Sequence, residues 1–211
     1  MEMILRNLEN KYPELTKCLD DIRKSFDILK STYNLKGKVL LCGNGGSASD
    51  CEHIVGELMK GFLLERPIDR SFKTSLLNEF SNDGEFIGNH LQMALPAISL
   101  VSQTSLITAI SNDLSPDMVF AQQVFAYGVK GDTIIGISTS GNSKNVLYAL
   151  KTAKVLGLRT IGITGASGGS FKDICDITIC VPFHRTLEIQ EKHVPIYHAL
   201  CAMLEEEYFL R

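Results

Sequence analysis

Apolar residues recur at intervals of three and four over the first 33 positions, as they do in an amphipathic helix. They are Ile4, Leu5, Leu8, Tyr12, Leu15, Cys18, Leu19, Ile22, Phe26 and Leu29. Pro13 interrupts this pattern and predicts a break or a bend in the helix. We therefore expect residues 1–35 to form an amphipathic helical extension, which covers either its own domain or a neighbouring subunit in an oligomer.

Short apolar runs then alternate with stretches of helical period. Strands are predicted at 38–42, 96–101, 133–138, 159–165 and 174–182, and helices at about 48–61, 105–110, 116–127, 142–156 and 187–208. Strands that alternate with helices form right-handed parallel crossovers. We therefore expect a single α/β domain over residues 1–211, with a doubly wound, mostly parallel sheet that carries helices on both faces.

Two of the predicted strands end in loops rich in glycine and serine. The first loop reads Gly43-Asn44-Gly45-Gly46-Ser47, and the second reads Ser138-Thr139-Ser140-Gly141-Asn142-Ser143. Glycines let a ligand approach the backbone, and the helix that follows each loop offers unpaired N–H groups to an anion. Neither loop matches a Walker A or GxGxxG motif, and one such loop alone is often only a helix cap. Together, at the carboxyl edge of one sheet, they predict a phosphate site built from neutral donors.

Composition narrows the range of partners. The formal net charge of the 211-residue chain is −3, so no basic excess points to nucleic acid or to an anionic membrane, and an anionic ligand must be held locally. No run of about 18 apolar residues predicts a membrane-spanning helix, and the first residues lack the pattern of a signal peptide. Six cysteines without a CxxC spacing favour a reducing, cytoplasmic setting.

His53 and Glu57 follow the first loop at a spacing that places them on one helix face. Such a pair is usually a surface ion pair, but this one comes just after a predicted anion site. The last predicted helix adds Gln190, His193 and His198 as further donors or ligands. Side chains of these types can bind a divalent metal, although neither CxxC nor HExxH is present.

These motifs, taken in their order along the chain, resemble the sugar isomerase (SIS) domain and, within it, the phosphoheptose isomerases. The resemblance rests on GNGGS-x5-H-x3-E at 43–57, Asn112-Asp113, the STSGNS loop at 138–143 and I-Q-E-x-H-x4-H at 189–198. It covers most of the chain, as far as about Arg66 and again from about Leu95. The second loop alone would indicate only a SIS domain, whereas the four motifs together are typical of the heptose branch.

The resemblance implies that a homotetramer, usually with zinc bound, isomerises sedoheptulose 7-phosphate to D-glycero-D-manno-heptose 7-phosphate. It implies substrate contacts from Asn44, Gly45, Gly46, Ser47, Asp113, Ser138, Thr139, Ser140, Ser143 and Gln190. It also implies zinc ligation by His53, Glu57, Gln190 and His198, with Glu57 and His198 as the catalytic pair. Moving a carbonyl between C2 and C1 requires a base for a carbon-bound proton and an acid for the oxygen. Zinc would either polarise the carbonyl or fix these groups.

Three features depart from the family pattern. Residues 68–94 look like an insertion, predicted as a loop with a short helix near 72–80 and a turn at 82–84. It would form a lid, a subunit contact or a surface decoration, and decoration is favoured because loops tolerate extra length at little cost. Leu187 stands where an acidic residue is frequent, and Pro195 lies inside the last predicted helix.

Two other functions stay open at this point. One is a SIS protein that binds a phosphosugar or a protein partner without catalysis, and the other is an isomerase of a different phosphosugar. A non-catalytic protein would be expected to lose its acid–base groups, so the presence of Glu57 and His198 favours an enzyme.

Overall fold

Five parallel strands form one sheet in the order β2-β1-β3-β4-β5. The strands are β1 Val39–Gly43, β2 Ala97–Ser99, β3 Thr133–Ile137, β4 Arg159–Thr164 and β5 Ile177–Cys180. The structure is a computed structural model and describes residues 1–210. The strand order reverses between β1 and β3, and doubly wound sheets bind ligands beside such a reversal. The predicted doubly wound parallel sheet is confirmed.

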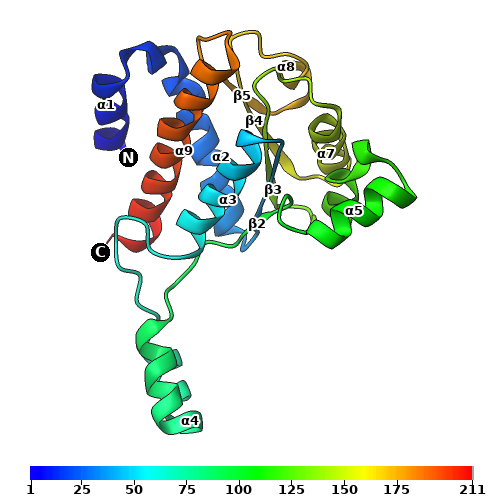
Figure 1. The fold of residues 1–211 in the computed structure, drawn as a ribbon. Helices are drawn as coiled ribbons and strands as arrows, with labels where there is room; N and C mark the ends of the chain where they lie inside the picture. Colours follow the sequence, from blue (N-terminus) through cyan, green and yellow to red (C-terminus); the bar gives the residue numbers. More distant parts are fainter. Residues whose placement is uncertain (211) are drawn as a thin grey trace.

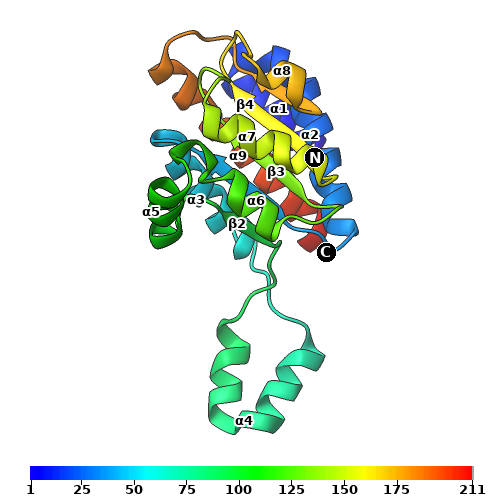
Figure 2. The ribbon, with the colours of Figure 1, turned by 90° about the vertical axis from the view of Figure 1, so that its right-hand side faces the viewer.

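Strand residues alternate between two hydrophobic cores, one on each face of the sheet. Val39 and Leu41 of β1 belong to the first core, whereas Leu40 and Cys42 belong to the second. The first core is completed by α1 Glu2–Lys11, α2 Leu19–Asn34, α3 Gly46–Met59 and α9 Thr186–Phe209. The second is completed by α5 Thr104–Asp113, α6 Ala121–Tyr127, α7 Lys144–Val155 and α8 Phe171–Ile174. Figures 1 and 2 show these two layers on opposite faces.

The N-terminal helical extension is interrupted where Pro13 predicts it. Tyr12 leaves the helical conformation after α1, and the short 3₁₀ helix η1 Pro13–Cys18 leads into α2. Both α1 and α2 contact α9, and Leu5 and Leu8 of α1 are buried. The apolar stripe therefore covers its own domain, and its role in oligomer packing stays a prediction.

Other elements differ from the prediction at their ends. The predicted helix at 116–127 is a 3₁₀ turn, η2 Pro116–Met118, followed by α6, and the predicted strand at 174–182 is shortened to β5. Helix α9 contains Pro195 in its interior, as the helix predicted at 187–208 does. Within residues 1–210, no helix has both the length and the apolar character needed to cross a membrane.

Helix α4 Arg70–His90 shows the largest departure from the prediction. It is a hairpin of two helices that stands away from the body, broken at Ser81, where φ is 49° (Figures 1 and 2). The first helix begins where the Asp69 carboxylate accepts the N–H of Phe72 at 2.8 Å. The second helix was predicted as a turn and loop because Asn82-Asp83-Gly84 is a turn signal and the apolar residues show no sustained helical period.

Candidate active site

The loops that follow β1 and β3 lie side by side at the carboxyl edge of the sheet. Gly43, the last residue of β1, is paired in register with Ile137, the last residue of β3. Immediately beyond, Asn44 and Asn145 exchange two hydrogen bonds, each 2.9 Å long, between their side-chain amides. The predicted convergence of the two loops is therefore present. Asn145 could not be predicted from the sequence, because its partner Asn44 is 101 positions away.

Hydroxyl groups of the second loop gather at the start of α7. The Ser138 Oγ lies 2.9 Å from the Ser143 Oγ and 3.4 Å from the Ser140 Oγ. Ser143 is the N-cap of α7, yet its side chain makes no capping hydrogen bond. Asn145 Oδ1 accepts the Val146 N–H at 2.9 Å, which leaves the N–H groups of Lys144 and Asn145 available. We call these three hydroxyls and the start of α7 the serine cradle. Neutral donors at a helix N-terminus suit a phosphate group.

A third loop supports the serine cradle from behind. Asn142 Oδ1 accepts hydrogen bonds from the N–H and the hydroxyl of Ser170, at 3.0 and 2.9 Å. Gly141 has a φ of 67°, and a Cβ at this position would collide with the carbonyl oxygen of Gly168. The Thr139 carbonyl accepts the N–H of Gly165 at 3.1 Å. The cradle is thus fixed in shape by contacts that do not use its hydroxyls as partners.

The first loop brings α3 against the start of α9. Gly45 has a φ of 57° and precedes α3, and Ser47 is buried in its first turn. A Cβ added to Gly46 would lie 2.7 Å from Nε2 of Gln190, so this amide packs against the helix start. Asp113 is the last residue of α5. Within residues 1–210 its carboxylate accepts a hydrogen bond from the side-chain amide of Asn112. Its predicted substrate contact stays a prediction.

Three predicted ligands meet between α3 and α9. The Glu57 Oε1 lies 3.0 Å from the His53 Nε2 and 3.2 Å from the His198 Nε2. Helix α3 supplies the first two side chains from one face, and α9 supplies the third. One ligand atom from each residue falls within 4.8 Å of the others. We call this set the His–Glu cluster. Gln190, the predicted fourth ligand, packs against Gly46, and its metal ligation stays a prediction.

The His–Glu cluster has the donors that a divalent cation requires. Oε2 of Glu57 is buried and has no hydrogen-bond partner within the described chain, which is costly for a carboxylate oxygen. His53 Nδ1 lies 3.0 Å from the Tyr197 hydroxyl, which donates in turn to Asp50 at 3.3 Å. Because the Tyr197 hydroxyl uses its proton on Asp50, it accepts a hydrogen bond from Nδ1–H of His53. The other ring nitrogen of the neutral His53, Nε2, then presents a lone pair to Glu57. A metal ion or a proton between the two would relieve their repulsion.

Tyr197 and Asp50 are the residues around the cluster that the sequence analysis missed. A histidine ligand is commonly held by a hydrogen bond to its second ring nitrogen. Asp50 precedes His53 by three positions and therefore shares its helix face, which was the available signal. Burial raises the pKa of Asp50 and, more strongly, that of Tyr197, so the phenol stays protonated as a donor. Burial also lowers the pKa of His198, against the opposing effect of the Glu57 carboxylate.

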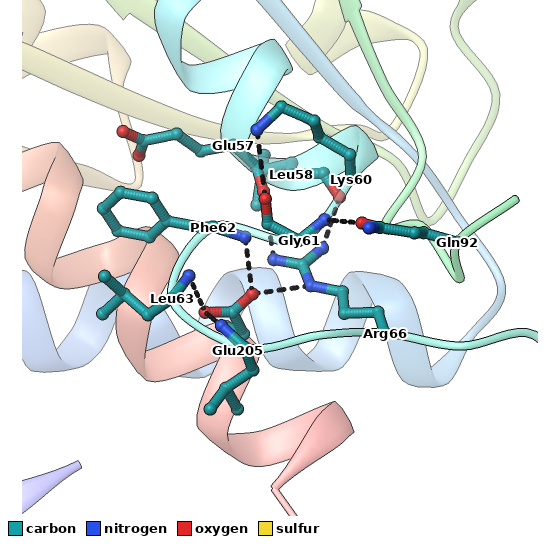
Figure 3. A network of polar contacts seen from close by, with 10 residues as sticks. Glu57, Leu58, Lys60, Gly61, Phe62, Leu63, Arg66, Gln92 and Glu205 are labelled. Atoms are coloured by element: carbon teal, nitrogen blue, oxygen red, sulfur yellow. Dashed lines mark hydrogen bonds and ion pairs between the residues drawn. The ribbon is translucent and has the colours of Figure 1, made fainter. Parts of the chain in front are cut away.

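A buried arginine holds the end of α3 close to the cluster (Figure 3). The Arg66 side chain is 1% exposed. Its guanidinium donates to the carbonyls of Leu58 at 2.8 Å and Glu57 at 3.0 Å, and to the Glu205 carboxylate at 2.7 Å. The last carbonyls of a helix lack partners within the helix, so Arg66 satisfies two of them. It thereby fixes the backbone that carries Glu57.

Glu205 of α9 completes this arrangement from the other side (Figure 3). Its carboxylate accepts the N–H groups of Phe62, Leu63 and Leu64 at 2.8, 2.7 and 3.1 Å. Burial alone would raise the pKa of Glu205, but these N–H donors and Arg66 together lower it. The loop after α3 is thereby tied to α9, with the Phe62 ring 5.6 Å from that of His198.

Known proteins resemble this chain over most of its length. A family model described as the SIS domain matches residues 80–165. The phosphoheptose isomerase of Clostridium acetobutylicum is 41% identical over 191 residues, covering 90% of this chain and 84% of the relative. Phosphoheptose isomerase 2 of Campylobacter jejuni is 43% identical over 185 residues, covering 88% of this chain and 79% of the relative.

Solved structures agree with this resemblance. A phosphoheptose isomerase from Francisella tularensis superposes with a TM-score of 0.75 at 30% identity, and the match covers 97% of each chain. Phosphoheptose isomerase GmhA from Neisseria gonorrhoeae gives a TM-score of 0.70 at 31% identity, covering 94% of this chain and 98% of that one. Sequence identity, fold and the order of the motifs lead to the same assignment. The chain belongs to the phosphoheptose isomerase family of SIS-domain proteins.

Proposed function

We propose that this protein isomerises sedoheptulose 7-phosphate to D-glycero-D-manno-heptose 7-phosphate through a cis-enediol. The observation that carries the proposal is the contact of 3.2 Å between Glu57 of α3 and His198 of α9. The loop from which α3 starts is joined through Asn44 and Asn145 to α7, the helix that begins at the serine cradle. A carboxylate and an imidazole are the side chains that most often move protons in catalysis. Membership of the phosphoheptose isomerase family supports the seven-carbon substrate.

Helix α3 relates the two halves of the proposed site. It begins at Gly46, beside the first loop, and Glu57 follows 11 residues later, roughly 16 Å along the helix axis. We propose that the serine cradle binds the phosphate, with Asn44, Ser47 and Thr139 beside it. The sugar then extends along α3 toward Glu57. This places the reacting carbons at the end of the substrate opposite the phosphate, as C1 and C2 are in a 7-phosphate.

At the reacting end, each group of the pair has a distinct task. The Glu57 carboxylate takes a proton from C1 of the ketose and returns it to C2. The protonated ring of His198, made more acidic by burial that lowers its pKa, gives a proton to the oxygen on C2, and the neutral ring then accepts one from the oxygen on C1. Arg66 and Glu205 hold the backbone on which Glu57 sits.

We propose zinc as the metal of the His–Glu cluster. Two imidazole nitrogens and a carboxylate oxygen form a donor set typical of zinc, and His53, Glu57 and His198 supply it. Gln190 is the proposed fourth ligand and also a sugar contact. When bound, the ion would act as a Lewis acid on the substrate carbonyl. Without it, Glu57 and His198 would still be the groups that move protons.

The proposed function is tested with a panel of ketose phosphates of five, six and seven carbons, assayed with and without a chelator. We expect turnover of the seven-carbon ketose, its loss with chelator and its recovery with added zinc. Turnover of a six-carbon substrate alone would contradict the heptose assignment. Binding of sedoheptulose 7-phosphate without turnover would show a binding protein instead.

We further propose a cytoplasmic homotetramer. The six cysteines are free, in keeping with a reducing compartment. An open groove of about 590 Å³ runs between α1 and α9, and apolar side chains such as Ile4, Leu8 and Val194 line it, with His198 at its edge. Apolar surfaces of this kind commonly mark interfaces. A neighbouring subunit seated there would close the site beside His198.

A further inference from the structure

The hairpin α4 has no hydrophobic core of its own. Its buried residues are two glycines, Gly84 and Gly88, on the face that the second helix turns toward the first. A Cβ at Gly84 would collide with the carbonyl of Leu76, and one at Gly88 would lie 2.8 Å from the Lys73 side chain. The two backbones therefore approach closely without burying a large side chain. Helices of about ten residues are marginal in water unless they pack against something.

Large apolar side chains of the hairpin face solvent instead. Phe72, Leu77, Phe80, Phe86, Ile87 and Leu91 are between 37% and 64% exposed. Large apolar side chains bury roughly 150–250 Å² each when fully covered, so these six leave on the order of 600 Å² uncovered. A standard interface buries roughly 800 Å² per partner. The hairpin thus presents most of the apolar area that a stable pairing requires.

The charges of the hairpin are separated along its length. Arg70 and Lys73 lie near its base, whereas Glu79 and Asp83 flank the turn at Ser81, which forms the tip. Glu85 follows on the second helix, where it lines a shallow hollow together with Arg70 and Lys73. None of these five side chains forms an ion pair within residues 1–210. Even with the Asp69 carboxylate that caps the first helix, the hairpin therefore carries net positive charge at its base and net negative charge at its tip.

We propose that α4 pairs with α4 of a second copy of this chain in an antiparallel arrangement with twofold symmetry. In that arrangement the acidic tip of each hairpin lies against the basic base of the other, so the favourable tip-to-base contact occurs twice. A twofold contact needs such a self-complementary surface. The four helices form a bundle whose interior is supplied by Leu77 and Phe80 of both copies, which are three positions apart and share a helix face.

Charge reversal tests this pairing by the mass of the assembly in solution. The result therefore does not depend on the proposed activity. One variant carries Glu79→Lys with Asp83→Lys and is basic at both ends. The other carries Arg70→Glu with Lys73→Glu and is acidic at both ends. We expect each variant alone to show a smaller assembly than the wild type in sedimentation velocity, because like charges oppose each other at the contact. An equimolar mixture of the two is expected to regain the wild-type mass.

A matched control carries Lys130→Glu with Lys151→Glu, two exposed lysines on the body, and is expected to keep the wild-type mass. Circular dichroism checks that the helix content is unchanged in every variant. Assemblies formed through other faces persist equally in all samples. Wild-type mass in each reversed variant alone, or failure of the mixture to regain it, would overturn the proposal.

Discussion

Glu57 is the single residue on which the proposed proton transfer most depends. Glu57→Gln keeps the shape of the side chain but removes the base, so turnover is expected to fall by a factor on the order of 10² or more. Binding of sedoheptulose 7-phosphate is expected to persist, because the serine cradle lies at the other end of α3. Steady-state kinetics and calorimetric binding measure the two quantities. Turnover at the wild-type rate, with metal content unchanged, would contradict this role.

Tyr197 is expected to tune the metal site without touching the ion. Tyr197→Phe removes the hydroxyl that lies 3.0 Å from His53 Nδ1 and frees the imidazole to rotate. Loss of such a partner typically lowers metal affinity by about 10–100-fold. Competition with a chromogenic chelator measures the zinc affinity. Tyr208→Phe is the matched control, since its hydroxyl binds Lys30 and Asn34 away from the cluster. Equal affinities in the two variants would disprove the proposed role of Tyr197.

Some residues of the candidate site could be predicted from the sequence and others could not. His53 and Glu57 were predictable as a pair because helix geometry alone puts residues four apart on one face. Asn145 and Tyr197 were not, because each makes its contact with a residue more than 100 positions away. Sequence patterns carry local periodicity, whereas such contacts exist only once the sheet has brought distant elements together.

At the scale of elements, periodicity predicted what is buried. The strands around β1 and β3 and the helices of both layers were recognised because their apolar residues face one of the two cores. The second helix of α4 was missed for the opposite reason. Its apolar side chains are exposed, and its glycines at 84 and 88 are explained by close contact with the first helix, not by a turn.

The connection between α3 and α9 should behave as one energetic unit. Arg66→Met leaves the Glu205 carboxylate buried without its charge partner, which typically costs about 3–5 kcal/mol in the free energy of unfolding. Glu205→Gln leaves the guanidinium unpaired in the same way. The double variant removes both charges and is expected to lose less stability than the sum of the two single losses. Urea unfolding at fixed protein concentration measures all three, and strict additivity would show that the two groups act independently.

The whole molecule places its chemistry at the carboxyl edge of the sheet and along one helix that leaves it. The reversal of strand order between β1 and β3 opens the sheet edge at the first and second loops, and α3 runs from there to the His–Glu cluster. The alternation of strands and helices was sufficient to predict the doubly wound sheet and a site at its carboxyl edge, but not the strand order. It could not predict which surfaces are covered in an assembly, because an exposed apolar side chain in α4 and a buried one in α3 look alike in a sequence.

Stability of the whole molecule should depend on pH through His193, which is fully buried within α9. Burial lowers its pKa from 6.5 to about 4, and the neighbouring backbone of Thr164 offsets only part of this. Between these two pH values, His193 is protonated in the unfolded chain but stays neutral in the folded chain. The free energy of unfolding therefore falls as pH drops through this window, by up to about 1.4 kcal/mol per pH unit, and His193 adds no slope above or below it.

Replacing the ring by an apolar side chain isolates this contribution. His193→Leu removes the titrating group, so its free energy of unfolding is expected to decline less steeply than that of the wild type between pH 6.5 and 4. Urea titrations at pH 7.5, 6 and 5, at one protein concentration, measure the slopes. His184→Leu changes an exposed histidine and is expected to keep the wild-type slope. Parallel pH profiles for His193→Leu and the wild type would mean that the imidazole is protonated as easily in the core as in water.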